Sequence, residues 1–308
     1  MSESRSSQTA ETESLTQAGV TIVVPAFNEE NGIEGVVERL AALELGVPVE
    51  VLIVNDGSTD GTAQRLVELT KRFDCLHVID HGMNRGYGAA LKTGFAKAQY
   101  EVVVITDADA TYPEDRIVDL LALIDAGAEM VVGARTGANV HVPLIRRPAK
   151  NALRILASYL AGTRIPDLNS GLRAFRRELV MEYRPILPDG FSFTTTITLA
   201  SLTNGHRVSH VSIDYAAREG RSKIKPIRDT LRFVGLIIRT VLYFNPLKVF
   251  YPVTAGLMVI LMGSLYYDFF MVEGPANLGD KSVLLFVAVV QVLSVGLLAD
   301  LIEKKSRL

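Results

Sequence analysis

The chain lacks the residues that disulfide-bonded and nucleic-acid-binding proteins use in quantity. Among its 308 residues there is one cysteine, Cys75, so no internal disulfide can form, and a buried thiol in a reducing compartment is the simplest interpretation. The chain carries 32 lysines and arginines against 34 aspartates and glutamates, a formal net charge of −2. A nucleic-acid-binding domain is normally markedly basic, so the composition predicts no nucleic-acid partner.

The N-terminus lacks the apolar stretch of a secretory signal peptide. Residues 1–18, MSESRSSQTAETESLTQA, are almost entirely polar or small. A segment with so few apolar side chains cannot bury enough surface to offset the entropy of ordering it. The sequence therefore predicts a disordered tail over residues 1–18.

Apolar residues, by contrast, are in excess, at 48% with a mean hydropathy of +0.25, and the excess lies at the C-terminus. Phe250–Met271 and Ser282–Ile302 are each long enough to cross roughly 30 Å of hydrocarbon. Two buried core helices are the alternative, but the single carboxylate in each run, Asp268 or Asp300, lies near its end. We therefore expect a two-span transmembrane region over residues 247–308, with a short cytoplasmic tail.

Basic residues flank the two apolar runs unevenly. Lys248 precedes the first run, and Lys304, Lys305 and Arg307 follow the second, whereas the connecting segment VEGPANLGDK has little positive charge. Cytoplasmic loops of membrane proteins are enriched in lysine and arginine, so both ends of this region are expected in the cytoplasm.

The segment before the spans, residues 226–246, has an amphipathic pattern. At roughly 100° per residue, Lys225, Arg228, Arg232 and Arg239 fall within about 60° of one another, and most of the remaining surface is apolar. This pattern favours an interfacial helix that lies on the membrane with its basic stripe toward lipid phosphates. A helix buried in a protein core remains the alternative.

Residues 20–134 alternate β-rich runs with amphipathic stretches. Strands that are apolar on both faces and alternate with helices predict an α/β fold, with a mostly parallel sheet and helices on both faces. Ligands of such sheets bind at the carboxyl ends of the strands, where this chain carries its polar motifs. The predicted strands are Val20–Pro25, Val49–Asn55, Leu76–Asp80, Val102–Thr106 and Met130–Ala134, and the predicted helices are Asn31–Leu45, Thr62–Phe73, Gly86–Ala98 and Pro113–Ala126.

From Arg146 to Tyr215 the pattern is looser. A helix is expected near Lys150–Ala161 and a strand near Val208–Asp214, with the loop DLNSG between them. We interpret this part as an extension that closes over the site, which gives one domain over residues 19–225.

The fourth predicted strand ends in two aspartates, Asp107 and Asp109, separated by one alanine. In an extended chain such side chains point the same way, and two like charges held so close are costly without a cation. Hard oxygen ligands at so few positions suit Mg²⁺ or Mn²⁺, whose other positions go to waters and phosphate oxygens. The alternative is an aspartate that caps a helix ahead of Pro113, with Glu114 and Asp115 as acids of the first turn.

Two further polar motifs end the first two strands. VNDGSTDGT (Val54–Thr62) follows the second strand, and PAFNEE (Pro25–Glu30) ends the first. A turn and a helix capped by Asp60 account for the former in structural terms. In functional terms, Asp56 at the strand end is an acceptor for a nucleobase N–H, and the neighbouring motif then places Glu29 beside a ribose.

Seven motifs occur in this order: PAFNEE, VNDGSTDGT, NRGYGAALKTGF (Asn84–Phe95), DADATYPED, GAR (Gly133–Arg135), DLNSGLRAFRR (Asp167–Arg177) and REGRSK (Arg218–Lys223). Together they resemble the family 2 glycosyltransferases of the GT-A fold. More narrowly, they resemble polyprenyl-phosphate glycosyltransferases, the group that contains dolichyl-phosphate mannose synthase and bacterial two-span relatives. The resemblance covers about residues 20–225 and the C-terminal spans.

The resemblance implies a Rossmann-like GT-A domain that transfers a hexose with inversion of configuration. The donor would be a UDP- or GDP-linked sugar, the acceptor a polyprenyl (undecaprenyl or dolichyl) phosphate, and the ion Mg²⁺ or Mn²⁺. The enzyme would contact membrane lipids at the cytoplasmic face of a bacterial or archaeal membrane, and a homo-oligomer is left open.

The resemblance also implies the residues of each site. The nucleotide-sugar site would comprise Pro25, Phe27, Glu29, Asp56, Asp107, Ala108 and Asp109. The metal would be held by Asp107 and Asp109. The acceptor phosphate would meet Arg135, Arg146, Arg218, Ser222 and Lys223. Catalytic roles fall to Asp107, Asp109, Arg135 and Arg146.

Three departures from the family pattern bear on specificity and mechanism. Thr111 stands where a glutamine is frequent, and GAR replaces the commoner GSR, which leaves UDP and GDP both open. FSFTTTITLA (Phe191–Ala200) has threonines where many relatives have a carboxylate, which favours a mechanism without a protein base. A synthase that extends a glycan and an inactive nucleotide-sugar-binding scaffold are the alternatives.

Overall fold

The computed structural model describes residues 15–137, 147–190, 192–216, 226–271 and 278–306. The chain divides into two compact units. The sheet unit comprises residues 1–141, 169–194 and 207–221, and the helical unit comprises residues 142–168, 195–206 and 222–308. Each unit is described by itself.

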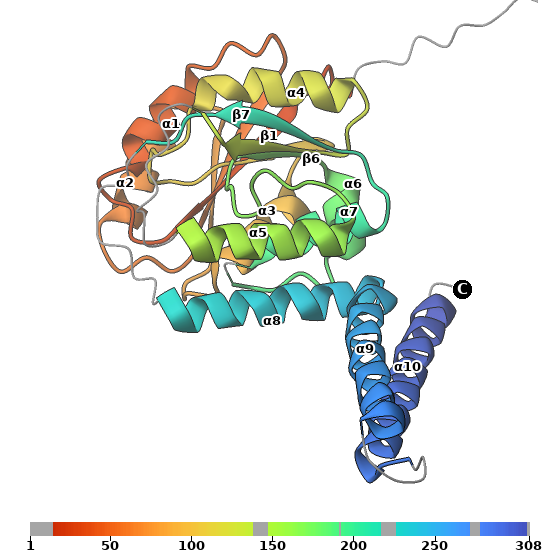
Figure 1. Ribbon diagram of the computed structural model, residues 1–308. Helices are drawn as coiled ribbons and strands as arrows, with labels where there is room; N and C mark the ends of the chain where they lie inside the picture. Colours follow the sequence, from red (N-terminus) through yellow and green to blue (C-terminus); the bar gives the residue numbers. More distant parts are fainter. Residues whose placement is uncertain (1–14, 138–146, 191, 217–225, 272–277, 307–308) are drawn as a thin grey trace, which may run out of the picture. The chain divides into compact units, whose positions relative to one another are not determined.

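The sheet unit is built on seven strands in the order β3-β2-β1-β4-β6-β5-β7 (Figure 1). All neighbouring strands are parallel except β6, which runs antiparallel to both β4 and β5. This confirms the predicted α/β class with a mostly parallel sheet. The strands are β1 Val20–Ala26, β2 Val49–Asn55, β3 Leu76–Asp80, β4 Val102–Ile105, β5 Met130–Arg135, β6 Arg173–Arg176 and β7 Val208–Ile213.

Helices cover both faces of the sheet because its central strands are apolar on both sides. Alternate strand residues such as Ile22 and Val104 pack against apolar residues of α1 and α4 in one cluster. On the opposite face α3 approaches so closely that a Cβ on Gly94 would lie 2.3 Å from Val23 Cγ1. The helices of this unit are α1 Ile33–Ala41, α2 Thr62–Leu69, α3 Tyr87–Lys97, α4 Ile117–Asp125 and α6 Arg177–Tyr183, with a 3₁₀ turn, η1, at Glu114–Arg116.

The antiparallel strand β6 is an element that sequence reasoning missed, as it also missed α6 and α7 (Phe193–Thr203). Its first residue, Arg173, pairs with Ile105 at the carboxyl end of β4. The Arg173 side chain is fully buried, and its Nε donates to the carbonyl of Ser170. Because β6 is antiparallel to β4, the residues just before it, 169–172, lie at the same edge of the sheet as the aspartates that follow β4.

One predicted acid, Glu114, and the end of the predicted tail have structural roles. Glu114 is buried and accepts two hydrogen bonds from the Arg39 guanidinium, at 3.0 and 2.9 Å. At the end of the predicted tail, the Thr16 hydroxyl donates to Asp125 of α4 at 2.6 Å. Residues 15–18, which the composition placed in the tail, are therefore among the described residues.

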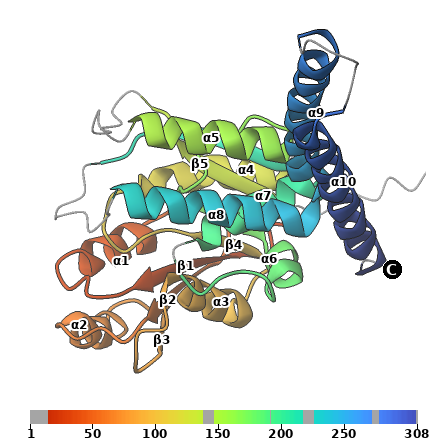
Figure 2. The ribbon, with the colours of Figure 1, turned by 60° about the horizontal axis from the view of Figure 1, so that its bottom comes forward.

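The helical unit contains α5 Arg147–Ala161, α8 Pro226–Phe244, α9 Leu247–Phe270 and α10 Asp280–Ser306, and α7 (Phe193–Thr203) enters it at Thr195. Figure 2 shows α5 and α8 side by side, and Ala157 and Leu160 of α5 pack with Ile237 and Val241 of α8 in one apolar cluster. The α5-facing side of α8 thus has the character of a core helix. Its placement on a membrane stays a prediction.

The last two helices, α9 and α10, are long and apolar enough to cross a membrane. In their most apolar 18-residue windows only 11% and 17% of the residues are buried. A core helix of a soluble protein would be mostly buried, so these exposed apolar surfaces favour the predicted spans over the core-helix alternative.

Candidate functional site

The loops after β1 and β2 are joined by hydrogen bonds at the carboxyl edge of the sheet. The backbone N–H of Asn28 donates to Ser58 Oγ at 3.0 Å, and Asn28 Oδ1 accepts from the Thr59 N–H at 2.8 Å. Glu30 Oε2 accepts from the Gly61 N–H at 3.1 Å. The motifs PAFNEE and VNDGSTDGT therefore form one surface.

The loop after β4 meets the same surface. Gly32, at the start of α1, lies so close that a Cβ there would be 2.9 Å from the carbonyl oxygen of Ala108. On the two sides of this contact, Asn28 and Ala110 both adopt φ of +57°. Left-handed backbone is unfavourable for side-chain-bearing residues and is concentrated at functional sites, where surrounding contacts hold it in place.

The two predicted metal ligands are each positioned by a hydroxyl donor. Tyr87 Oη, at the start of α3, donates to Asp107 Oδ1 at 3.1 Å. Asp109 Oδ1 accepts from the Thr111 hydroxyl at 2.6 Å and from its backbone N–H at 3.3 Å. The backbone of the DLNSG loop also touches Asp107, since a Cβ on Gly171 would lie 2.6 Å from Asp107 Oδ2.

The donor set at this edge fits a small divalent cation. Asp107 and Asp109 supply hard carboxylate oxygens, and among the described residues no group of three or more His, Cys, Asp or Glu is arranged so that it could hold a metal ion. A protein cage for Ca²⁺ or a structural zinc site would need more ligands. Mg²⁺ and Mn²⁺ accept one or two carboxylates and take their other ligands from water and substrate phosphates.

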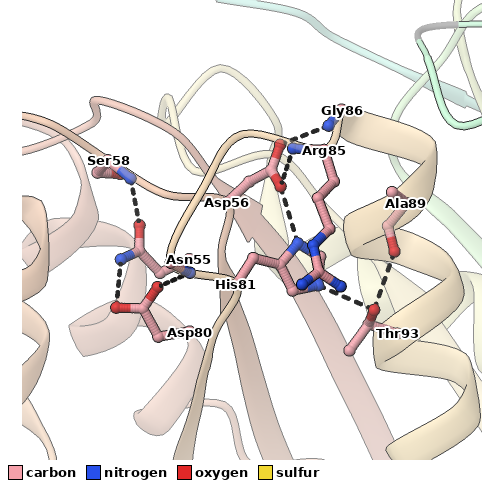
Figure 3. A network of polar contacts seen from close by, with 10 residues as sticks. Asn55, Asp56, Ser58, Asp80, His81, Arg85, Gly86, Ala89 and Thr93 are labelled. Atoms are coloured by element: carbon pink, nitrogen blue, oxygen red, sulfur yellow. Dashed lines mark hydrogen bonds and ion pairs between the residues drawn. The ribbon is translucent and has the colours of Figure 1, made fainter.

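Asp56 lies in a buried hydrogen-bond network at the end of β2 (Figure 3). Its Oδ1 is 2.8 Å from His81 Nδ1 and accepts from the Arg85 N–H at 2.9 Å. Its Oδ2 accepts from the Gly86 N–H at 2.8 Å. The side chains of Asp56 and His81 are each 4% exposed, so this carboxylate is held almost rigidly.

Two tyrosines, Tyr112 and Tyr215, connect the loop that carries Asp107 and Asp109 to Arg135. The Tyr112 hydroxyl accepts from the Gly171 N–H at 2.6 Å, and its ring packs edge-on against Tyr215, with centroids 5.2 Å apart. The Arg135 guanidinium lies over the Tyr215 ring, 5.1 Å from its centroid. Arg135 is therefore held at the end of β5 by a cation–π contact.

The phenols of Tyr112, which is buried, and Tyr87, which is half-buried, remain protonated across the neutral range. Burial, followed by the negative charge of Asp107, raises the pKa of Tyr112 and raises that of Tyr87 well above its usual value. A neutral Tyr87 can donate to the Asp107 carboxylate, and it cannot serve as a base near neutral pH.

The structure describes all of the residues predicted for the nucleotide sugar and the metal, and brings the loops that carry them together at one edge of the sheet. Phe27 is 42% exposed at the end of β1, Ala108 is buried, and Glu29 donates its backbone N–H to Thr62 Oγ1 at 3.0 Å. The predicted acceptor residues Arg146, Arg218, Ser222 and Lys223 lie outside the described residues.

Four site residues had no role assigned from sequence: His81, Tyr87, Tyr112 and Gly171. Tyr87, Tyr112 and Gly171 stand inside motifs that carried the family resemblance, so their motif membership was the available signal. His81 stands outside these motifs. Its contact with Asp56 depends on the pairing of β2 with β3 and is invisible in a local pattern.

Comparisons with known proteins agree with this geometry. The sequence profile of Glycosyl transferase family 2 matches residues 21–184, and that of the GtrB C-terminal hairpin matches residues 245–304. The chain is similar to a polyprenol monophosphomannose synthase of Mycolicibacterium smegmatis, with 31% identity over 213 residues, which are 66% of this chain and 80% of that protein.

In a second curated relative, the match covers a smaller share of the relative's own length. It is the undecaprenyl-phosphate 4-deoxy-4-formamido-L-arabinose transferase of Salmonella paratyphi A, 28% identical over 214 residues. The match covers 68% of this chain and 63% of that protein, so the chain spans less than two thirds of this relative.

Among solved structures, the chain resembles glucosyl-3-phosphoglycerate synthase from Mycobacterium tuberculosis, crystallised with Mn²⁺, uridine diphosphate and glucosyl-3-phosphoglycerate. The TM-score is 0.56 at 23% identity, over 72% of this chain and 78% of that one. This likeness establishes the fold. With the profile match over more than half of the chain, the conclusion is that the protein belongs to glycosyltransferase family 2 and is a glycosyltransferase of GT-A fold.

Proposed function

We propose that this glycosyltransferase transfers a hexose from a nucleotide sugar to a polyprenyl phosphate at the cytoplasmic face of a bacterial or archaeal membrane, with inversion at the anomeric carbon. One observation carries the proposal. The loops bearing Asp56, Glu29 and the Asp107–Asp109 pair converge at one sheet edge, in a chain that ends in two apolar helices of spanning length. The two curated relatives, whose names specify polyprenol and undecaprenyl phosphate, support the acceptor class.

The donor would lie along this edge with its base toward Asp56 and its diphosphate toward the aspartate pair. Asp107 and Asp109 would hold a divalent cation, which when bound supplies positive charge for the leaving nucleoside diphosphate. Tyr87 and Thr111 orient the two carboxylates, so little rearrangement of the protein is needed as charge develops.

The acceptor chemistry accounts for the threonines of FSFTTTITLA. A sugar hydroxyl needs a base to remove its proton, whereas a phosphate monoester has a second pKa of about 6 and is already largely ionised near neutral pH. The protein then has to position an anion, and arginine's planar fork suits that task. Arg135 is the described candidate, and Arg146, Arg218, Ser222 and Lys223 complete the proposed acceptor-phosphate set.

The test is to incubate membranes that contain the enzyme with polyprenyl phosphate and a panel of radiolabelled nucleotide sugars. We expect a lipid-extractable labelled product with one of the donors, which mild acid releases as the free sugar. Asp109→Asn membranes are the control. Label transferred only to water or to a soluble glycan would contradict the proposed acceptor.

A further inference from the structure

Three hydrogen-bond donors of the protein already occupy the carboxylate of Asp56. Oδ1 faces His81 Nδ1 at 2.8 Å and the Arg85 N–H at 2.9 Å, and Oδ2 accepts the Gly86 N–H at 2.8 Å. An ionised carboxylate has two oxygens with about four acceptor positions in all. Oδ1 is therefore saturated, and one position remains, on Oδ2.

The proton on His81 Nδ1 follows from the same count. An ionised carboxylate only accepts, so the 2.8 Å contact requires an N–H at Nδ1. On the other side of the ring, Nε2 lies 2.9 Å from Thr93 Oγ1, which is itself 3.1 Å from the carbonyl of Ala89. If Thr93 donates to His81 the imidazole is neutral, and if it donates to Ala89 the ring carries both protons. In either arrangement Nδ1 donates to Asp56.

The loop that supplies the two backbone donors is packed against the turn that carries Asp56. Gly57 has φ of +69°, and a Cβ there would lie 2.4 Å from the carbonyl carbon of Met83. Only glycine allows the backbones to approach this closely. Figure 3 shows Arg85 and Gly86 presenting their N–H groups to Asp56 from this loop, while His81 approaches from the end of β3. All three donors are thus fixed by the fold before any ligand binds.

Nucleobases differ in what they offer such an acceptor. The Watson–Crick edge of guanine presents two adjacent donors, N1–H and the N2 amino group, which match a carboxylate with both oxygens available. Uracil presents one, the N3–H, between two carbonyl groups. Cytosine and adenine present an acceptor nitrogen at that position, which a carboxylate repels. A single open position on Oδ2 accordingly fits uracil best.

We propose that Asp56 binds the imide N–H of uracil, that the donor is a uridine diphosphate sugar, and that His81 sets this preference as a positioning residue by occupying Oδ1. The inference rests on the proposed function and goes beyond it by choosing between two nucleotides. Phe27, exposed at the end of the neighbouring strand, supplies an aromatic surface on which the base can stack.

The first experiment measures the affinities of UDP and GDP for the full-length detergent-solubilised protein by calorimetry with Mn²⁺ present. We expect UDP to bind about tenfold more tightly or better, because guanine leaves one buried donor unmatched. Equal affinities, or tighter GDP binding, would overturn the inference and leave a nucleotide-binding glycosyltransferase intact. Failure of both nucleotides to bind would overturn the proposed function along with it.

The second experiment compares two substitutions of His81. The amide nitrogen of Asn can take the place of Nδ1, so His81→Asn should keep the ratio of UDP to GDP affinity within about threefold. His81→Leu frees Oδ1 to meet the second donor of guanine, and the ratio should fall to about 2 or below. General damage to the fold would lower both affinities and leave their ratio unchanged, and thermal unfolding reports such damage directly.

The matched control is His77→Leu. His77 lies on β3, four residues before His81, with its side chain 60% exposed, so this variant should retain both affinities. If His81→Leu keeps the wild-type ratio, His81 does not set the preference and that part of the proposal fails. If His81→Asn loses the ratio as fully as His81→Leu, a hydrogen bond at Nδ1 is not the cause.

Discussion

Replacing Gly171 with alanine should separate catalysis from stability. A Cβ at this position would lie 2.6 Å from Asp107 Oδ2 and 2.8 Å from Oδ1. Ordinary contacts begin near 3.4 Å, so the carboxylate has to move by about 0.8 Å or rotate away from the Tyr87 hydroxyl. A misplacement of about 1 Å in a reacting constellation costs on the order of 10²-fold in rate. We expect kcat/KM for sugar transfer to fall by that factor.

The same change should cost little stability. The clash is with the end of a side chain that can rotate, and alanine restricts the unfolded chain, which stabilises a protein by about 0.4–1 kcal/mol where the backbone allows it. The free energy of unfolding of the sheet unit should therefore change by about 1 kcal/mol or less.

The assay measures lipid-linked product against donor concentration and across a Mn²⁺ titration, together with the thermal unfolding midpoint. We expect Gly171→Ala to need more Mn²⁺ for half-maximal activity, because the displaced carboxylate is a weaker ligand. Gly190→Ala is the matched control, since a Cβ there meets nothing within 4 Å. Wild-type kcat/KM and an unchanged Mn²⁺ requirement in Gly171→Ala would refute the assignment of Asp107.

Three further predictions test the metal, a half-buried ion pair and the membrane topology. Asp109→Asn should lower the rate of sugar transfer by about 10²–10³-fold, measured as radiolabelled product. EDTA should abolish the activity of the wild type until Mg²⁺ or Mn²⁺ is added back. Full activity in EDTA would exclude the metal. Arg39→Gln leaves the buried Glu114 carboxylate without its bidentate partner, so the free energy of unfolding measured by chemical denaturation should fall by about 1–2 kcal/mol. Arg65→Gln is the control: it loses only exposed ion pairs and should change that free energy by about 0.5 kcal/mol or less. A cysteine at Asn277 should react with an impermeant maleimide added outside intact cells, and labelling only after the cells are opened would reverse the proposed orientation.

The central strands were predictable from sequence because burial on both faces leaves a simple pattern. The strand β2, VEVLIVN, matches its expected bounds, and β1, β4 and β5 differ from theirs by one residue at an end. Strand β6 was not predictable in the same way. Its four residues, RAFR, begin and end with arginine, and the burial of Arg173 depends on tertiary partners such as the Ser170 carbonyl.

The candidate site likewise contains residues whose placement follows from the sequence pattern and contacts that only the folded chain creates. The placement of Asp56, Asp107 and Asp109 at one edge of the sheet was predictable, because each follows an apolar strand and the carboxyl ends of parallel strands meet at the same edge. The donors that hold Asp56 were not, since two of them are backbone N–H groups that any residue would supply at positions 85 and 86. These two N–H groups point at Asp56 because of the backbone path of the loop at residues 83–86, which packs against Gly57.

The position of β6 between β4 and β5 sets an order of events during synthesis. Both neighbours leave the ribosome before β6 does. Until β6 is added, β4 has one edge without a hydrogen-bonded partner, and the place of β5 is about two strand spacings, roughly 10 Å, from β4. An unpaired edge of this kind invites association with other chains until the missing strand arrives. The DLNSG loop arrives together with β6, so the contact of Gly171 with Asp107 forms at the moment the edge is closed. The sheet and the candidate site at its carboxyl edge can thus be complete before α9 is synthesised.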